Sequence, residues 1–300
     1  MKSTNAVVLP GERSVLAERM LDYLELTKPR IAVLVLLTVW AGGYAASRGT
    51  ANPLLLLHAV IGTALVAAGS SVLNQLSEQD VDKRMRRTAD RPLPSGRVSA
   101  SEARLFAGLL AISGSVYLAV LVNYQAMFLA IVSLVLYAWV YTPMKRYTTL
   151  NTAVGAIPGA LPPLIGWSAA GMPLDLEAWS LFGIVYCWQF PHFYAIAWLH
   201  REDYERAGLQ MLPTSELGRR LTGLQVVSHG LLLLPVSLAP SYFGLTGTIY
   251  FWGTLVLGLQ FVGYGIWFLL EQTDARARLL LWASLVYLPV VFGLLTLDLA

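Results

Sequence analysis

The sequence is poor in charge. Of its 300 residues, 13% are Asp, Glu, Lys or Arg, whereas soluble globular domains carry roughly 25%. Hydrophobic residues make up 56% of the chain. So few charged side chains cannot cover the surface of a soluble domain of this length. The composition therefore excludes a soluble enzyme or binding domain and indicates an all-α protein that crosses the membrane several times.

Cysteine is almost absent as well. Cys187 is the only one, and it lies inside an apolar run, which excludes an intrachain disulfide and a thiolate metal cluster. The N-terminal segment lacks the apolar stretch of a secretory signal peptide, and its acidic residues are atypical of an organellar transit peptide. We therefore expect a short cytoplasmic arm, residues 1–30, and a single transmembrane domain, residues 31–300.

Long apolar runs are abundant. A membrane-spanning helix needs about 18–25 mainly apolar residues, and runs that fit this length predict nine spans at 31–48, 52–75, 103–121, 125–142, 151–169, 177–199, 222–240, 247–270 and 279–298. The fifth run is interrupted by three glycines and three prolines. In lipid, such a segment is tolerated only where it packs against other helices or lines a cavity.

The basic residues are distributed unevenly. With nine spans, every one of the 21 Lys and Arg residues except Arg48 lies on the side of the N-terminus. The positive-inside rule then predicts a cytoplasmic N-terminus and a C-terminus on the opposite side. We attribute the net charge of +3 to contacts with anionic lipid headgroups and not to nucleic acid.

Three oxygen-bearing side chains recur at four-residue intervals, starting at the end of the second span. Asn74, Glu78 and Asp82 therefore share one face of a helix. Such a stripe suits Mg²⁺, which takes a few protein oxygens and leaves its other positions to substrate phosphates. The basic residues that follow it are Arg84, Arg86, Arg87 and Arg91. Acidic and basic groups together at the membrane surface predict chemistry on a lipid-like diphosphate.

A second acidic loop follows the sixth span, on the same predicted side of the membrane. It contains Glu202, Asp203 and Glu205, with His200 and Tyr204 at the four-residue spacing. The sequence similarity between the two loops is too low to establish a repeat. Two acidic loops on one face are nevertheless expected to hold two metal ions against one diphosphate.

The first loop resembles the Asn-x-x-x-(Asp/Glu)-x-x-x-Asp motif of the UbiA superfamily of intramembrane prenyltransferases. Within that superfamily, the chain is similar to the branch that farnesylates protohaem IX. The matching stretches are Leu26–Arg30, Asn74–Gly96, Tyr141–Arg146, Asn151 with Gly155–Trp167, Trp188–Phe193 and Asp203–Pro213. The resemblance implies a bundle of nine transmembrane helices around a central cavity, with Mg²⁺ as the cofactor. The chain departs from many members in lacking a second Asp-x-x-x-Asp, so the partners of Asp203 at a second metal site stay open.

The resemblance also assigns candidate site residues. The metal ligands it implies are Asn74, Glu78, Asp82 and Asp203. Those four, together with Arg87, Arg91 and Lys145, are the expected catalytic set. Lys28, Arg146, His192 and Tyr204 are expected to bind substrate or cofactor. His192 stands out because it lies between aromatic residues, and imidazole is a common haem ligand.

The implied reaction joins farnesyl diphosphate to a vinyl group of haem B, with addition of water and release of diphosphate. Its expected setting is the bacterial inner membrane, among lipids, with haem-modifying or terminal-oxidase assembly proteins as partners downstream.

Three alternatives remain open. They are a UbiA-type prenyltransferase with another aromatic, quinone or tetrapyrrole acceptor, a non-catalytic haem-handling protein, and a secondary transporter. A transporter is disfavoured because its charged site would lie near the membrane midplane, whereas these carboxylates lie at the predicted cytoplasmic ends of helices.

Overall fold

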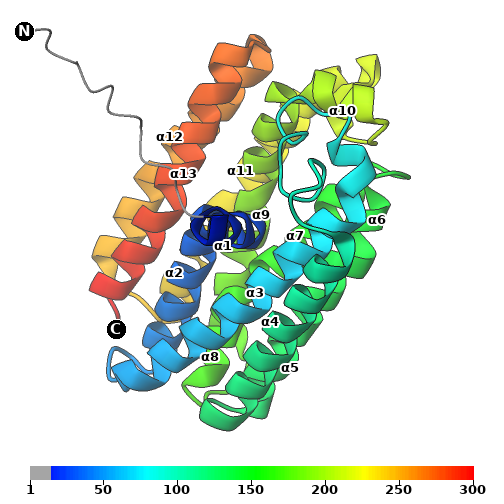
Figure 1. Cartoon of the computed structure of the whole chain (residues 1–300). Coiled ribbons are helices and arrows are strands. Elements are labelled where there is room, and N and C mark those ends of the chain that lie inside the picture. The colour runs from blue at the N-terminus through cyan, green and yellow to red at the C-terminus, as the bar shows by residue number, and fades with distance from the viewer. Residues whose placement is uncertain (1–14) are drawn as a thin grey trace, which may run out of the picture.

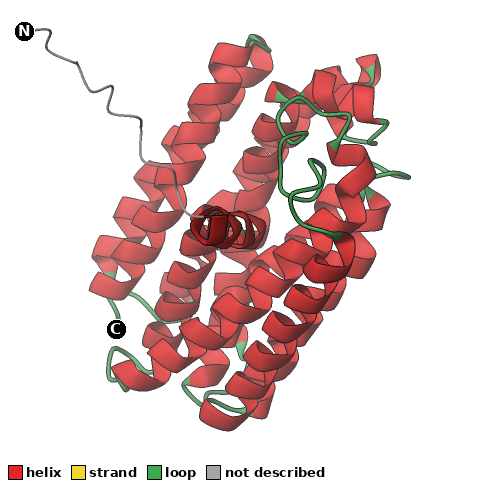
Figure 2. Ribbon diagram, viewed as in Figure 1, coloured by secondary structure: helices red, strands yellow, loops and turns green. Residues whose placement is uncertain are grey.

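A computed structural model describes residues 15–300 of the chain, and within this range the secondary structure is helical apart from one isolated bridge between Thr246 and Leu299 (Figures 1 and 2). The helices, with a π-helix η1 and a 3₁₀-helix η2, are α1 (Val15–Thr27), α2 (Pro29–Ala46), α3 (Pro53–Asp82), α4 (Ala100–Leu121), α5 (Tyr124–Val135), η1 (Leu136–Tyr141), α6 (Thr142–Met144), α7 (Asn151–Ala160), α8 (Pro162–Ala169), α9 (Leu176–Leu199), α10 (Arg201–Ala207), η2 (Leu212–Thr214), α11 (Glu216–Tyr242), α12 (Thr248–Leu270) and α13 (Asp274–Leu297).

Seven segments of residues 15–300 are long and apolar enough to cross a membrane: α2, α3, α4, the α5–η1–α6 segment, α11, α12 and α13. Helix α9 has 24 residues but is not in this group; Trp, Tyr, Gln and His side chains lower its mean hydropathy. More than half of its residues are buried against other helices, so it has little surface for lipid to cover. The protein is a multi-pass membrane protein with an all-α fold.

The predicted span 151–169 is two helices in the structure. Helix α7 ends at Ala160 and α8 begins at Pro162, because consecutive prolines lack the N–H groups that would continue the helix. Asn151, at the start of α7, donates a hydrogen bond to the carbonyl oxygen of Gln210. Ser168, near the end of α8, accepts one from Asn123 at the opposite end of the bundle. The α7–α8 pair therefore runs the length of the bundle, as the prediction required, but as a broken helix.

Glycines permit α2 and α8 to pack backbone against backbone. A Cβ atom at Gly166 of α8 would overlap the carbonyl oxygen of Val39, and one at Gly42 of α2 would overlap that of Pro163. Neither neighbour is a flexible side chain that could move aside. The contact holds the broken α7–α8 pair against α2, which begins at the site described below.

Gly166→Ala is therefore expected to lower the free energy of unfolding by about 1–3 kcal/mol or more, because the added methyl group overpacks a backbone contact. Thermal unfolding in detergent would measure the change. The matched control is Gly263→Ala in α12, where a Cβ atom meets no other heavy atom within 4 Å. Equal melting temperatures for the two variants would contradict the close packing of α2 on α8.

Helix α1 occupies part of the segment expected as an arm; residues 1–14 lie outside the described residues. Figure 1 shows α1 end-on, across the helices of the bundle. It is joined to the bundle through buried Leu26, whose carbonyl oxygen accepts a hydrogen bond from Gln75 of α3. An ion pair between Asp22 and Arg97 adds a second tie. Lys28 follows Leu26 by two residues, so this tie places Lys28 against the C-terminal half of α3.

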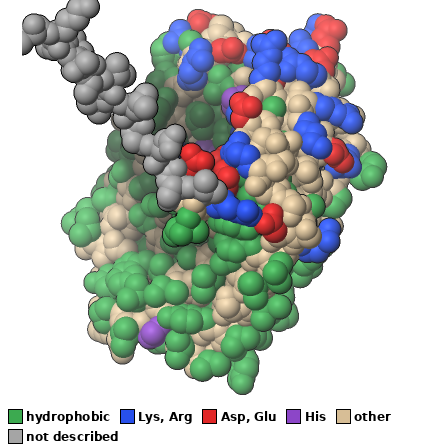
Figure 3. All heavy atoms as spheres, viewed as in Figure 1, with side chains coloured by type: hydrophobic (Ala, Val, Ile, Leu, Met, Phe, Trp, Pro, Cys, Tyr) green, Lys and Arg blue, Asp and Glu red, His purple; other side chains and the backbone are tan. Residues whose placement is uncertain are grey.

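Charged side chains gather at one end of the molecule. In Figure 3 the blue and red side chains lie mostly at the end where Figure 1 places α10, while the rest of the visible face is mainly hydrophobic or uncharged. The uneven distribution of charge along the sequence thus becomes a polar end and a mainly apolar remainder on this face of the folded chain.

Candidate active site

The candidate site lies at the polar end of α3. Asn74, Glu78 and Asp82 are all buried on one face of this helix, and they line a pocket of about 220 Å³. The four-residue spacing therefore produces the predicted stripe. The pocket is also lined by residues from α2, η1, α9 and the loops after α3, α6 and α10.

Each oxygen-bearing side chain is paired with a cation from another segment. The Nζ of Lys28 donates to Asn74 Oδ1 at 2.9 Å. The Nζ of Lys145 lies 2.8 Å from Glu78 Oε1, and Arg91 lies 2.8 Å from Asp82 Oδ2. Three positive groups around one pocket match the charge of a diphosphate, since Lys and Arg are the usual phosphate-binding side chains.

Local structure places these cations. Lys28 is the residue between α1 and α2, and its φ of 51° turns the chain sharply before Pro29 opens α2. Arg91 lies in the loop after α3, which folds back on the helix because Thr88 donates to the carbonyl oxygen of Asp82. The Nε2 of Gln79 also donates to the carbonyl oxygen of Leu93 in this loop.

The π-helix η1 places Lys145. Tyr137 and Tyr141 of η1 line the pocket, and the Nζ of Lys145 lies 4.5 Å from the centre of the Tyr141 ring. Thr142 accepts a hydrogen bond from Asn74 at 3.0 Å and donates one to the carbonyl oxygen of Tyr137. π-Helical turns occur often at functional sites. No role for these three residues could be predicted from the sequence, because a π-helical turn leaves no clear periodic pattern.

The cations affect one another. Burial, together with the nearby charges of Arg91 and Lys145, lowers the pKa of Lys28 to about 7. Burial also disfavours the charge of Lys145, but the Glu78 carboxylate outweighs it and raises the pKa of Lys145. A bound diphosphate would add negative charge and stabilise the protonated form of Lys28.

The oxygen stripe fits a Mg²⁺ ion. Asp82 Oδ1 is buried and has no hydrogen-bond partner within the described residues, while Oδ2 is held by Arg91. An orphaned carboxylate oxygen in a pocket is a ligand available to a hard cation. The described part of the chain contains no group of three or more His, Cys, Asp or Glu side chains placed to hold a metal. Any metal here would therefore rely on Asn74, on substrate oxygens or on water as well.

Other predicted site residues divide into two groups. Arg87 and Tyr204 line the pocket. Asp203 does not, because its Oδ1 accepts from Arg206 at 2.9 Å and lies 3.4 Å from the backbone nitrogen of Arg86. The second acidic loop therefore reaches the pocket through Tyr204, and the role of Asp203 at a second metal site stays a prediction. In the structure, Asp203 holds the first loop in place.

Arg146 and His192 also lie outside the pocket lining. Arg146 donates to the carbonyl oxygen of Ser77 on the exposed side of α3. His192 stacks on Trp188, four residues earlier on the same helix face, with ring centroids 4.8 Å apart. Its Nδ1 lies 2.8 Å from Ser284 Oγ of α13. His192 thus faces α13, one position before Phe193, which does line the pocket.

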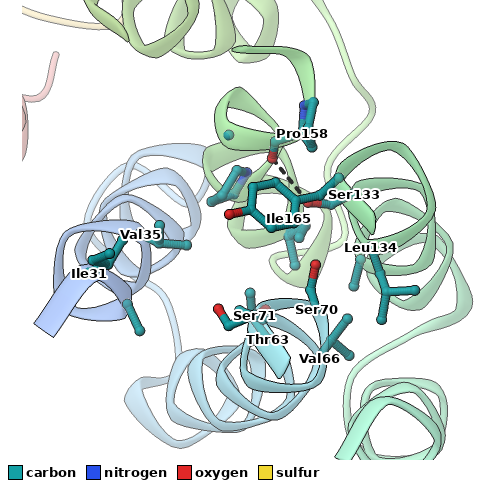
Figure 4. A pocket seen from close by; sticks show the side chains of 16 residues that line it. Ile31, Val35, Thr63, Val66, Ser70, Ser71, Ser133, Leu134, Pro158 and Ile165 are labelled. Carbon is teal, nitrogen blue, oxygen red and sulfur yellow. Dashed lines mark hydrogen bonds between the residues drawn. The ribbon is translucent and has the colours of Figure 1, made fainter. Parts of the chain in front are cut away.

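A second cavity continues from the first toward the middle of the bundle. It measures about 140 Å³ and is mainly apolar, with walls from α2, α3, α5, η1, α7 and α8 (Figure 4). Ile31 and Tyr137 line both cavities. A polar pocket that continues into an apolar cavity is the shape required by a ligand with a diphosphate head and a hydrocarbon tail. The broken segment 151–169 and the family resemblance both predicted a cavity, but neither predicted which side chains line it.

Known proteins are similar to this chain in sequence and in fold. Relatives named protoheme IX farnesyltransferase include one from Solibacter usitatus, 47% identical over 93% of this chain and 99% of the relative. Another, from Koribacter versatilis, is 39% identical over 98% of this chain and 96% of the relative. A solved structure of a digeranylgeranylglyceryl phosphate synthase has a TM-score of 0.75 at 19% identity and covers 93% of this chain and 98% of its own. A UbiA homologue from Archaeoglobus fulgidus bound to DMAPP and Mg²⁺ has a TM-score of 0.68 at 18% identity, with 91% and 99% covered.

At these identities the solved structures establish the fold alone. A model of the UbiA prenyltransferase family matches residues 35–288, which is most of the chain. This match contradicts the transporter and non-catalytic alternatives. The chain belongs to the UbiA prenyltransferase family.

Proposed function

We propose that this prenyltransferase moves the farnesyl group of farnesyl diphosphate to a vinyl group of haem B, with addition of water, to give haem O and diphosphate. The observation that carries the proposal is the polar pocket with three cations and an oxygen stripe, joined to an apolar cavity at Tyr137. The names of relatives that align over nearly the whole chain support the choice of substrates.

In the first step, the polar pocket binds the diphosphate. Arg91 and Lys145 would contact its oxygens, and Lys28 and Arg87 would assist from the same pocket. Asn74, Glu78 and Asp82 are the residues that would hold Mg²⁺. The bound metal would supply neutralisation of the charge that develops on the leaving group.

In the second step, the apolar cavity protects the reactive chain. Departure of diphosphate leaves an allylic cation, which bulk water would capture at once. The cavity walls include Val66, Leu134 and Ile165, so they exclude bulk water from the hydrocarbon chain (Figure 4). The terminal carbon of the haem vinyl group attacks the allylic carbon, and water then adds to the carbon next to the porphyrin ring.

The assay for this proposal uses purified protein with haem B, farnesyl diphosphate and Mg²⁺. Mass spectrometry should detect a haem product heavier by one farnesyl group and one water. If the protein instead farnesylates an added aromatic acid or quinone precursor and leaves haem unchanged, it belongs to another branch of the family.

The haem contact that we propose is His192. Ser284 Oγ donates its proton to the carbonyl oxygen of Leu281 at 2.6 Å, so it accepts from His192 Nδ1–H. In this tautomer Nε2 carries the lone pair, as an iron ligand requires, and no hydrogen bond to Nε2 is found in the described part of the chain. Trp188 holds the ring flat against one side.

His192→Ala is therefore expected to change the absorption spectrum of haem-loaded protein and to raise the haem concentration needed for half-maximal rate. Farnesyl diphosphate binding should stay unchanged. The control is His58→Ala, because His58 hydrogen-bonds Tyr117 between α3 and α4, away from the pocket. An unchanged spectrum with full activity would assign His192 to helix packing alone.

The location that we propose is the bacterial inner membrane, with the N-terminus and the polar end of α3 in the cytoplasm. Haem-modifying or terminal-oxidase assembly proteins would receive the product.

A topology reporter fused after Ala300 should be active only outside the cytoplasm, because all basic residues except Arg48 lie on the predicted cytoplasmic side. A reporter inserted within residues 83–100 should be active only inside. Cytoplasmic activity of the Ala300 fusion would show an even number of crossings and would contradict the passage of α7–α8 through the membrane.

A further inference from the structure

Two serine hydroxyls in the apolar cavity lack hydrogen bonds. Hydroxyls in membrane helices usually donate to a carbonyl one turn earlier, as Ser115 does to Ala111 and Thr38 to Val35. Ser70 and Ser71 of α3 make no such bond within the described residues, although Ser70 is 93% buried, its exposed fraction being 7%. Figure 4 shows their oxygens directed toward the cavity.

A third hydroxyl completes the group. Tyr137 of η1 lines the same cavity, and no hydrogen bond of its phenolic oxygen is found within residues 15–300. The hydroxyl of Ser133, on the same wall of the cavity, is different because it donates to the carbonyl oxygen of Pro158 at 3.0 Å (Figure 4). Within the described residues, the cavity thus contains one hydroxyl that is paired, that of Ser133, and four without a partner, of which Thr63 lies apart from the other three.

These three hydroxyls lie on the side of the apolar cavity that adjoins the polar pocket. Ser70 precedes Asn74 by four residues, one turn and about 6 Å along α3. Tyr137 lines both the polar pocket and the apolar cavity. If the polar pocket holds the diphosphate and the apolar cavity holds the farnesyl chain, the allylic carbon that joins them lies where the two cavities meet. The three hydroxyls are then close to that carbon.

Water is the ligand that suits this group. A buried water typically makes about three hydrogen bonds to polar groups that are otherwise unsatisfied. Thr63 is the other unpartnered hydroxyl on this wall. It lies two turns, roughly 10 Å, from Ser70, so it cannot share the same water.

We propose that Ser70, Ser71 and Tyr137 hold the single water molecule that completes the reaction, an inference that rests on the proposed function. When the farnesyl carbon bonds to the terminal vinyl carbon, the positive charge moves to the carbon beside the porphyrin ring. The oxygen of the held water forms a bond to that carbon and loses one proton to the departing diphosphate in the adjoining pocket. One ordered water serves as reactant while bulk water stays outside.

The product distribution tests this proposal. Without the held water, the cation loses a proton from the neighbouring carbon and leaves an alkene, which is lighter than the normal product by one water. Ser70→Ala, Ser71→Ala and the isosteric Ser70→Cys should each raise the ratio of alkene to hydroxylated product about tenfold, the effect of one lost hydrogen bond. Ser133→Ala is the matched control and should leave the ratio unchanged, because its hydroxyl is already paired.

The ratio is measured on whatever product forms, so a slow variant still gives a result. A ratio equal to that of the unaltered protein in all three serine variants would overturn the water site. An equal rise in Ser133→Ala would overturn it too, since cavity shape and not the unpaired hydroxyls would then be responsible. Failure of the unaltered protein to form any haem adduct would instead refute the proposed function.

Discussion

Asp82→Asn is expected to reduce turnover at least about 100-fold at saturating Mg²⁺, while the protein stays inserted and folded. Asn keeps the size of the side chain but removes the charge that would neutralise the metal. Asp82 is fully buried, and among residues 15–300 its Oδ1 has no hydrogen-bond partner. The rate of haem product formation in detergent or lipid would measure the loss.

The control for this variant lies two residues earlier on the same helix. Asp80 is exposed and contacts only Lys83 at 3.4 Å among the described residues, so Asp80→Asn should keep a near-normal rate. Both variants remove one negative charge from the end of α3. Near-normal rates in both would refute the metal-ligand role of Asp82, and equal losses would reduce it to an effect of net charge.

Arg91→Ala is expected to lower kcat/KM for farnesyl diphosphate about 10- to 100-fold, the usual effect of losing a hydrogen bond to a charged group. Haem affinity, followed by absorption, should change little, because Arg91 lies in the diphosphate pocket and pairs with Asp82. The control is Arg84→Ala, since Arg84 is exposed and does not line the pocket.

Arg91→Ala also leaves the buried Asp82 without its partner, which is destabilising in itself. Arg91→Lys separates the two effects because it keeps the charge but loses the forked geometry. If Arg91→Lys restores folding but not diphosphate use, Arg91 contacts substrate. Equal losses for both substrates in Arg91→Ala, with full recovery in Arg91→Lys, would assign it to structure.

The parts of the site that could be predicted are those encoded by local periodicity. The spacing of Asn74, Glu78 and Asp82 defines a helix face whatever the rest of the chain does, and the structure buries all three. Apolar runs of span length likewise predict helices, because lipid leaves few alternatives for the backbone. The family resemblance then supplied the cations Arg91 and Lys145, although their partners could not be read from spacing.

Pairings between distant segments could not be predicted. Lys145 meets Glu78 across 67 residues, and Lys28 meets Asn74 across 46. The contacts of Asp203 could not be predicted either, since its carboxylate accepts from Arg206 at 2.9 Å and lies beside the pocket lining. These outcomes depend on how helices pack and on how η1 turns the chain, and neither leaves a periodic signal in the sequence.

The central claim is that a metal–diphosphate complex binds on the Asn74–Glu78–Asp82 face of α3. Its most direct test is to titrate Mn²⁺, as a probe of the Mg²⁺ site, into purified protein with an unreactive farnesyl diphosphate analogue and to count bound ions by electron paramagnetic resonance. We predict that the unaltered protein and Asp80→Asn bind Mn²⁺ only with the analogue present, and that Asp82→Asn weakens this binding at least about tenfold. Equally tight binding in Asp82→Asn would contradict the account.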